Sequence, residues 1–69
     1  MKELNTQKIQ NKLRNKFLAS GVNMPGPETI FFSNDTKIGK NVTIEPYVVI
    51  GKNVKIGSNV VIKSFSHLE

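Results

Sequence analysis

The residues of this chain that could perform chemistry are few and far apart. His67, the only histidine, could act as a general base if a partner oriented it. Its neighbours Ser66 and Leu68 supply no such partner, and its place in the repeat described below directs it outward. Glu45 and Glu69 could form a carboxylate pair, but Glu45 replaces a corner glycine, where a solvated side chain is expected. We therefore predict no catalytic residue.

The composition excludes other common kinds of site. The chain has no cysteine, so disulfides, thiolate zinc ligands and a cysteine nucleophile are excluded. One histidine cannot build a multi-histidine metal site, and the five glycines form no phosphate-binding loop. We predict no metal and no cofactor.

The length favours a small module. A chain of 69 residues allows one small domain, whose own core is marginal. No apolar run approaches the ~20 residues that span a membrane, and the first ten residues lack the apolar stretch of a secretory signal. We expect a cytoplasmic protein without a membrane partner, either a binding module, an oligomerising module or a fragment.

Residues 3–20 have the pattern of a helix. Ile9, Leu13 and Phe17 recur every four residues and form a narrow apolar stripe. Gly21 can take the left-handed conformation that closes a helix, and the next residue can pack back on the last turn. Because so short a stripe is marginal alone, it must lie on its own domain or on a neighbouring chain. The three stripe residues are therefore suspected interface residues.

The same helix is basic. Half of the ten basic residues lie in the first sixteen positions, namely Lys2, Lys8, Lys12, Arg14 and Lys16. Such a helix could bind phosphate groups of nucleic acid or of a membrane surface. Asparagine and glutamine dilute the charge and few aromatic residues interleave it, so we expect a solvated face rather than a nucleic-acid site.

From residue 32 the sequence repeats with a period of six. The first position of each block is large and apolar: Phe32, Ile38, Ile44, Ile50, Ile56, Ile62 and Leu68. The fifth position is small or β-branched, several second positions hold glycine, and most fourth positions hold Asn or Asp. A period of six does not fit a helix, but it fits a short strand followed by a corner, where Gly, Asn and Asp tolerate positive φ.

Repeats of this kind predict a parallel β-helix with three blocks, or eighteen residues, in each coil. Residues eighteen apart should then stack at strand spacing. We expect Ile38 under Ile56, Ile44 under Ile62 and Ile50 under Leu68, with Ile30 under Val48.

Tyr47 and Phe65 occupy the fourth block position, where Asn or Asp usually stands. They are eighteen residues apart, so they should be neighbours on one corner and should face outward. An exposed aromatic pair favours an interface, and we predict one here.

The stretch from Phe17 to Glu69 resembles the central region of the bacterial bifunctional N-acetylglucosamine-1-phosphate uridyltransferase / glucosamine-1-phosphate acetyltransferase family. The segment GVNMPGPETIFFSNDTKIG, residues 21–39, is its most specific part. The resemblance implies a mainly β fold, a left-handed parallel β-helix of about two coils preceded by one N-terminal α-helix. The expected division is a helical arm over 1–21, a Pro/Gly-rich linker over 22–31 and a β-helix over 32–69. The resemblance also implies trimers that associate side by side.

In that family the uridyltransferase site lies in an N-terminal domain and the acetyltransferase site in later coils. Neither is matched here, so no catalytic residue carries over. The leading hypothesis is a non-catalytic fragment or remnant that keeps the self-association region of an enzyme making UDP-N-acetylglucosamine. Two alternatives stay open: a subunit of a split hexapeptide acyltransferase, completed by a chain carrying the remaining coils, and an anion-binding adaptor that uses the basic helix.

Overall fold

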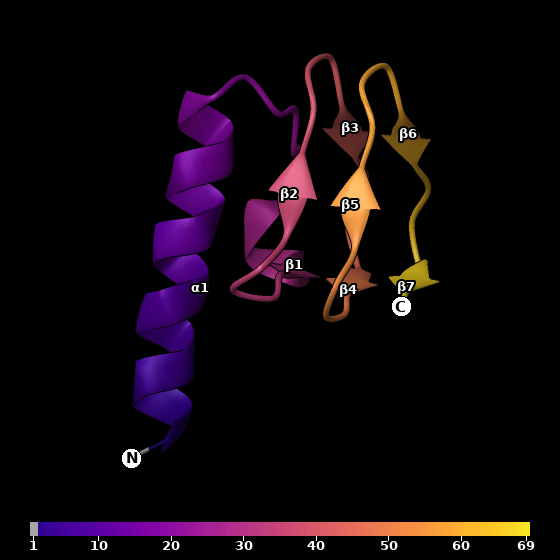
Figure 1. The fold of residues 1–69 in the computed structure, drawn as a ribbon. Helices are drawn as coiled ribbons and strands as arrows, with labels where there is room; N and C mark the ends of the chain where they lie inside the picture. The colour runs from indigo at the N-terminus through magenta and orange to yellow at the C-terminus, as the bar shows by residue number, and fades with distance from the viewer. Residues whose placement is uncertain (1) are drawn as a thin grey trace.

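One helix precedes a set of short strands that wind around a common core (Figure 1). The computed structural model describes the backbone of residues 2–69 and the side chains of residues 7–69. Met1, where the expected arm begins, and the side chain of Lys2 lie outside the described residues. The elements are α1 (Lys2–Ala19), the 3-10 helix η1 (Pro27–Thr29), β1 (Ile30–Phe31), β2 (Lys37–Ile38), β3 (Thr43–Ile44), β4 (Val48–Ile50), β5 (Lys55–Ile56), β6 (Val61–Ile62) and β7 (His67–Leu68).

The end of α1 has the predicted glycine closure. Gly21 has a φ of 100°, and its N–H donates to the Leu18 carbonyl at 3.1 Å. The Val22 N–H donates to the Phe17 carbonyl at 3.0 Å, which completes the Schellman pair of bonds. Val22 is buried, so the chain leaves the helix by packing back on its last turn.

The strands pair in parallel with an offset of eighteen residues. β1, β4 and β7 form one sheet, β2 and β5 a second, and β3 and β6 a third. The register confirms the predicted stacks: Ile30 with Val48, Ile38 with Ile56, Ile44 with Ile62, and Ile50 with Leu68. This pairing is typical of a parallel β-helix. In Figure 1, α1 lies at one end of the stack and β7 at the other.

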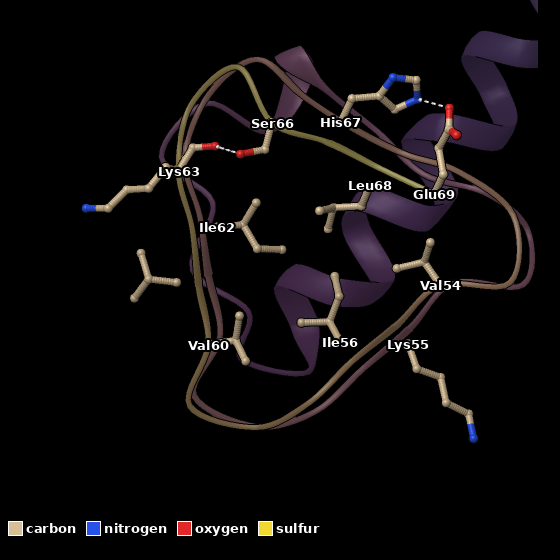
Figure 2. A pocket seen from close by; sticks show the side chains of 11 residues that line it. Val54, Lys55, Ile56, Val60, Ile62, Lys63, Ser66, His67, Leu68 and Glu69 are labelled. Carbon is tan, nitrogen blue, oxygen red and sulfur yellow. Dashed lines mark hydrogen bonds and ion pairs between the residues drawn. The ribbon is translucent and has the colours of Figure 1, made fainter.

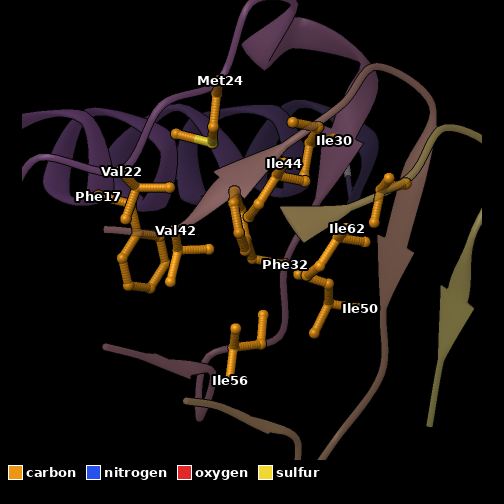
Figure 3. Packing of buried hydrophobic residues seen from close by; sticks show 11 residues of the cluster. Phe17, Val22, Met24, Ile30, Phe32, Val42, Ile44, Ile50, Ile56 and Ile62 are labelled. Carbon is orange, nitrogen blue, oxygen red and sulfur yellow. The ribbon is translucent and has the colours of Figure 1, made fainter. Parts of the chain in front are cut away.

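The helix and the strands share one core (Figure 3). Phe17 of α1 packs on Phe32, with ring centroids 4.8 Å apart. Val22 and Met24 close the same side, and the inward residues of successive strands fill the rest. The most deeply buried side chains are Ile30, Val42, Ile44 and Val48.

The corners are built differently from the sequence prediction. Positive φ occurs at the fourth block position, at Asn41, Tyr47, Asn53, Asn59 and Phe65, and Gly21 is the one glycine in the described residues that has it. The expectation that the repeat glycines also turn the corners through positive φ is wrong. Gly39 allows close approach instead: a Cβ there would lie 2.6 Å from the Ser58 Oγ and 2.8 Å from its backbone nitrogen. A Cβ on Gly51 would lie 3.0 Å from the Leu68 carbonyl, whereas Gly57 has no atom within 4 Å of that position.

The buried face of α1 also differs from the predicted stripe. Gln10 and Arg14 are buried, each only 8% exposed, whereas Ile9 is 41% exposed and Leu13 is partly buried. The Gln10 amide donates to the Phe32 carbonyl at 2.7 Å and accepts from the Phe32 N–H at 2.8 Å. Arg14 Nε donates to the Ile30 carbonyl at 3.0 Å.

The reason is the edge that β1 presents to the helix. Its backbone groups on the side away from β4 have no strand partner, and buried backbone groups must be hydrogen-bonded. Polar side chains satisfy that requirement and Ile9 cannot. Gln10 and Arg14 therefore form a polar cap on this end of the β-helix.

Candidate interaction surfaces

The predicted acid–base candidates lie on the surface. His67 Nε2 is 3.5 Å from a Glu69 carboxylate oxygen, with the two side chains 59% and 79% exposed. Glu45 lies 3.7 Å from Lys63 Nζ, so Glu45 and Glu69 each have a basic partner. Among the described residues no three His, Cys, Asp or Glu side chains gather where they could hold a metal ion. His67 and Glu69 have no third side chain that orients them, and the group that orients Glu45 is a backbone N–H of the neighbouring coil, at Ser64.

Side chains at the corners continue the hydrogen bonding between neighbouring coils. Asp35 accepts from the Asn53 N–H at 3.0 Å, and Glu45 accepts from the Ser64 N–H at 3.0 Å. A short bond from the Ser33 hydroxyl is the largest effect that lowers the pKa of Asp35, followed by the Asn53 N–H. The Ser64 N–H is the largest effect that lowers the pKa of Glu45. Both carboxylates thus bind the next coil in their charged form.

These lowered pKa values predict acid sensitivity. A carboxyl group whose pKa is lower in the folded state stabilises the fold above its ordinary pKa of about 4, and this stability is lost as the pH falls through the folded value. We expect the midpoint of thermal unfolding to fall in that range. Asp35→Asn/Glu45→Gln should show a smaller fall, measured by circular dichroism between pH 6 and about 2. If the unfolding midpoint of the double variant fell with pH as much as that of the wild type, these two carboxylates would not be the source of the acid sensitivity.

The predicted aromatic pair is present. Tyr47 and Phe65 stack with ring centroids 5.4 Å apart and an interplanar angle of 3°, and they are 58% and 80% exposed. Their backbones have φ values of 65° and 64°. This left-handed conformation costs roughly 1–2 kcal/mol per residue for side chains other than Gly, Asn or Asp.

A hydrogen-bonded ladder holds this strained corner. The Tyr47 N–H donates to the Thr29 hydroxyl at 2.9 Å, and the Phe65 N–H donates to the Tyr47 carbonyl at 2.8 Å. Strained conformations persist where the surroundings determine them in this way, and they are frequent at functional positions. We call Pro46, Tyr47, Ser64 and Phe65 the aromatic corner.

Charged and apolar side chains occupy different sides of the β-helix. The sheet of β2 and β5 directs Lys37 and Lys55 outward, and Lys40 and Lys52 stand at the corners that bound it. We call this side the lysine face. The other two sheets direct the exposed apolar residues Phe31, Val49 and Val61 outward. These two sheets meet at the aromatic corner, which is therefore opposite the lysine face.

The far end of the stack is hollowed (Figure 2). Ile56, Ile62 and Leu68 point into the interior there, with Val54 and Val60 beside them. Lys55 and Lys63 point away from the hollow. Ile56 and Ile62 are still only 7% and 6% exposed, so the hollow is shallow.

The suspected interface residues of α1 have three environments. Phe17 is in the core, Leu13 packs partly against it, and Ile9 borders a groove on the outer side of the helix with Lys8 and Lys12. The sequence patterns did not indicate Gln10 and Arg14, nor did they indicate the exposed valines Val49 and Val61. The valines had a usable signal, because the sixth block position holds Lys, Thr or His in other blocks.

Within the described residues no helix is both long and apolar enough to cross a membrane.

The repeat, the eighteen-residue register and the outward corners together define a hexapeptide-repeat protein. The family described as bacterial transferase hexapeptide (six repeats) matches residues 35–69, and the chain belongs to it. The chain is also similar to curated relatives that share one name. "Bifunctional protein GlmU" of Nitrobacter hamburgensis is 55% identical over 62 residues, which is 90% of this chain.

Two further relatives with this name come from Gluconobacter oxydans, 51% identical over 88% of the chain, and Rhodopseudomonas palustris strain BisA53, 55% identical over 87%. The chain spans only 14%, 14% and 13% of the lengths of these three relatives. No solved structure gave a significant match.

Proposed function

We propose that this chain is a self-associating hexapeptide-repeat module, without catalytic activity of its own, from the family that makes UDP-N-acetylglucosamine. The observation that carries the proposal is the division of its polar groups. The buried polar side chains Gln10 and Arg14 bond to backbone, and so does the half-buried Glu45, whereas His67 and its partner Glu69 are exposed. The side chains thus support folding and surface contact rather than a reaction.

The expected assembly is a homotrimer of parallel β-helices. Similarity to the bifunctional relatives supports it, and closed symmetry is the usual outcome for homo-oligomers. We also propose that the coils wind left-handed and number about two, since the hexapeptide period favours that form. Sedimentation equilibrium at micromolar concentration should give three times the chain mass of 7.7 kDa. A monomer mass at all concentrations would contradict self-association.

The purified chain should be catalytically silent. Assays for uridyl transfer and for acetyl transfer from acetyl-CoA should give only the rate of a heat-treated control. Glu45 is bound to Ser64 and Lys63 within the fold, and His67 is exposed beside Glu69. Turnover above that control, abolished by His67→Ala or by Glu45→Gln, would overturn the proposal.

One observation favours a second function. Ile56, Ile62 and Leu68 line the shallow hollow at the far end of the stack (Figure 2). A further coil could pack there, and in a split hexapeptide acyltransferase another chain would supply it. Co-purification with a chain that carries such coils, together with acetyl transfer by the complex alone, would support this function over the first.

The anion-binding adaptor has weaker support. Arg14 is buried against the Ile30 carbonyl, so one of the helix cations serves the fold. Lys8, Lys12 and Lys16 are exposed. Salt-dependent retention on heparin that disappears in Lys8→Gln/Lys12→Gln would favour the adaptor.

A further inference from the structure

The aromatic corner combines three features. Its rings are exposed, its backbone is in a conformation that aromatic residues disfavour, and a hydrogen-bonded ladder holds it there. The other positive-φ positions of the β-helix hold asparagine, which tolerates this conformation. Tyr47 and Phe65 therefore carry a backbone cost that asparagine would not, and within the isolated chain only their mutual stacking offsets it.

The surroundings extend this corner into an apolar surface. Val49 follows Tyr47 by two residues and is 43% exposed, while Val61 precedes Phe65 by four and is 56% exposed. Among the described residues, Glu45 and Lys63 beside the corner pair with each other at 3.7 Å. His67, next to Val49, pairs with Glu69 at 3.5 Å. Glu28 borders the corner at Pro46, since a Cβ on Gly26 would lie 3.3 Å from Pro46 Cγ and 3.4 Å from the Glu28 carboxylate. The surface is thus largely apolar, with most of its neighbouring charges in pairs.

The distribution of charge indicates which kind of molecule would bind at the aromatic corner. The chain carries a net charge of +5, and four lysines lie on and around the lysine face. A nucleic acid or an acidic protein would be drawn to that face, on the opposite side of the β-helix. Two identical cationic chains repel each other there, but they can approach closely at the corner, where most charges are paired and most side chains are apolar.

We propose that the aromatic corner, with Val49 and Val61, is the surface on which a second copy of this chain docks. The proposal rests on the proposed self-association and assigns its contact. Stacked, pre-ordered aromatic rings lose little conformational freedom on association and are typical hot-spot residues. Burying the two rings in an interface would offset the cost of their positive-φ backbone.

The test compares the wild type with Tyr47→Asn/Phe65→Asn. Asparagine already occupies the equivalent corner positions 41 and 59, where the two amides bond at 3.1 Å, so the double variant should fold. We expect its circular dichroism to match the wild type and its dissociation constant to rise at least about 30-fold, the size of a hot-spot effect. Lys37→Gln/Lys55→Gln is the matched control on the lysine face and should associate at least as tightly as the wild type.

An optical measurement reports on the same surface. Tyr47 is the only tyrosine and the chain has no tryptophan, so the intrinsic fluorescence comes from this corner. Quenching of that fluorescence by acrylamide should decrease as the wild-type protein is concentrated. Val61→Lys keeps both rings and adds a charge at an exposed strand position, so it should weaken association even if the double variant does not fold.

The outcomes separate the two proposals. A wild type that is monomeric at every concentration would contradict both the self-association and its contact. An oligomeric wild type whose Tyr47 stays open to acrylamide, and whose mass is unchanged by Val61→Lys, would overturn only the assignment of the corner. Loss of the oligomer in Val61→Lys with retention in the control supports the assignment.

Discussion

Replacing Ile44 with aspartate is expected to unfold the chain. Ile44 has no exposed surface, lies in β3, and stacks on Ile62 of β6. The substitution removes a buried apolar side chain and places a charge where no basic partner is available, so the loss should exceed about 4 kcal/mol. A domain of this size has a total stability of roughly 3–10 kcal/mol. Circular dichroism at 25 °C should show the loss of the folded signal.

Thr43→Asp is the matched control for this variant. Thr43 is adjacent in the same strand, and its side chain lies on the opposite face of the sheet, across from the exposed Val61. The change should cost less than about 1 kcal/mol, typical of a substitution outside the core. Equal destabilisation of the two variants would show that the assigned inward and outward positions of β3 are incorrect.

Replacing Gln10 with leucine is expected to have the second largest effect. Leucine has a similar size, but it leaves the N–H and the carbonyl of Phe32 without their partners. Each unsatisfied buried group costs about 1–3 kcal/mol, so we expect a loss of about 2–6 kcal/mol. Urea unfolding should show a lower midpoint with little change in slope.

Gln7→Leu makes the same chemical change three residues earlier on the same helix, where Gln7 is exposed. This control should leave the urea midpoint almost unchanged. If Gln10→Leu behaved like Gln7→Leu, the two Gln10 hydrogen bonds would contribute no stability and α1 would be held by its other contacts, those of Leu13, Arg14 and Phe17.

The stacking of the strands could be predicted from the sequence because it depends only on the length of the repeat and on the number of repeats in each coil. A six-residue block and a three-sided coil require contact between residues eighteen apart, whatever the details of the corners. The prediction therefore held for Ile38 and Ile56 and for Ile50 and Leu68. It also placed Tyr47 and Phe65 side by side, although aromatic residues are poor candidates for the corner backbone they occupy.

The polar cap could not be predicted in the same way. Periodicity arguments assign apolar residues to the buried face, and Ile9 fits that pattern better than Gln10 does. The outcome depends instead on an unpaired strand edge of β1, which exists only once the chain is folded and α1 lies beside it. The glycines were misassigned for a related reason, because freedom of φ and the absence of a Cβ are both properties of glycine. Only the short distance between Gly39 and Ser58 shows which one is used.

The polar cap has a consequence for how copies of this chain can polymerise. A solenoid whose two ends both offer strand edges can add copies head to tail without limit, and such open contacts produce filaments. Gln10 and Arg14 occupy backbone groups of Ile30 and Phe32 at the β1 edge, and Asn23 pairs with Thr43 at the β3 edge, so a neighbouring copy finds little template there. Growth along the axis is thereby opposed on that side.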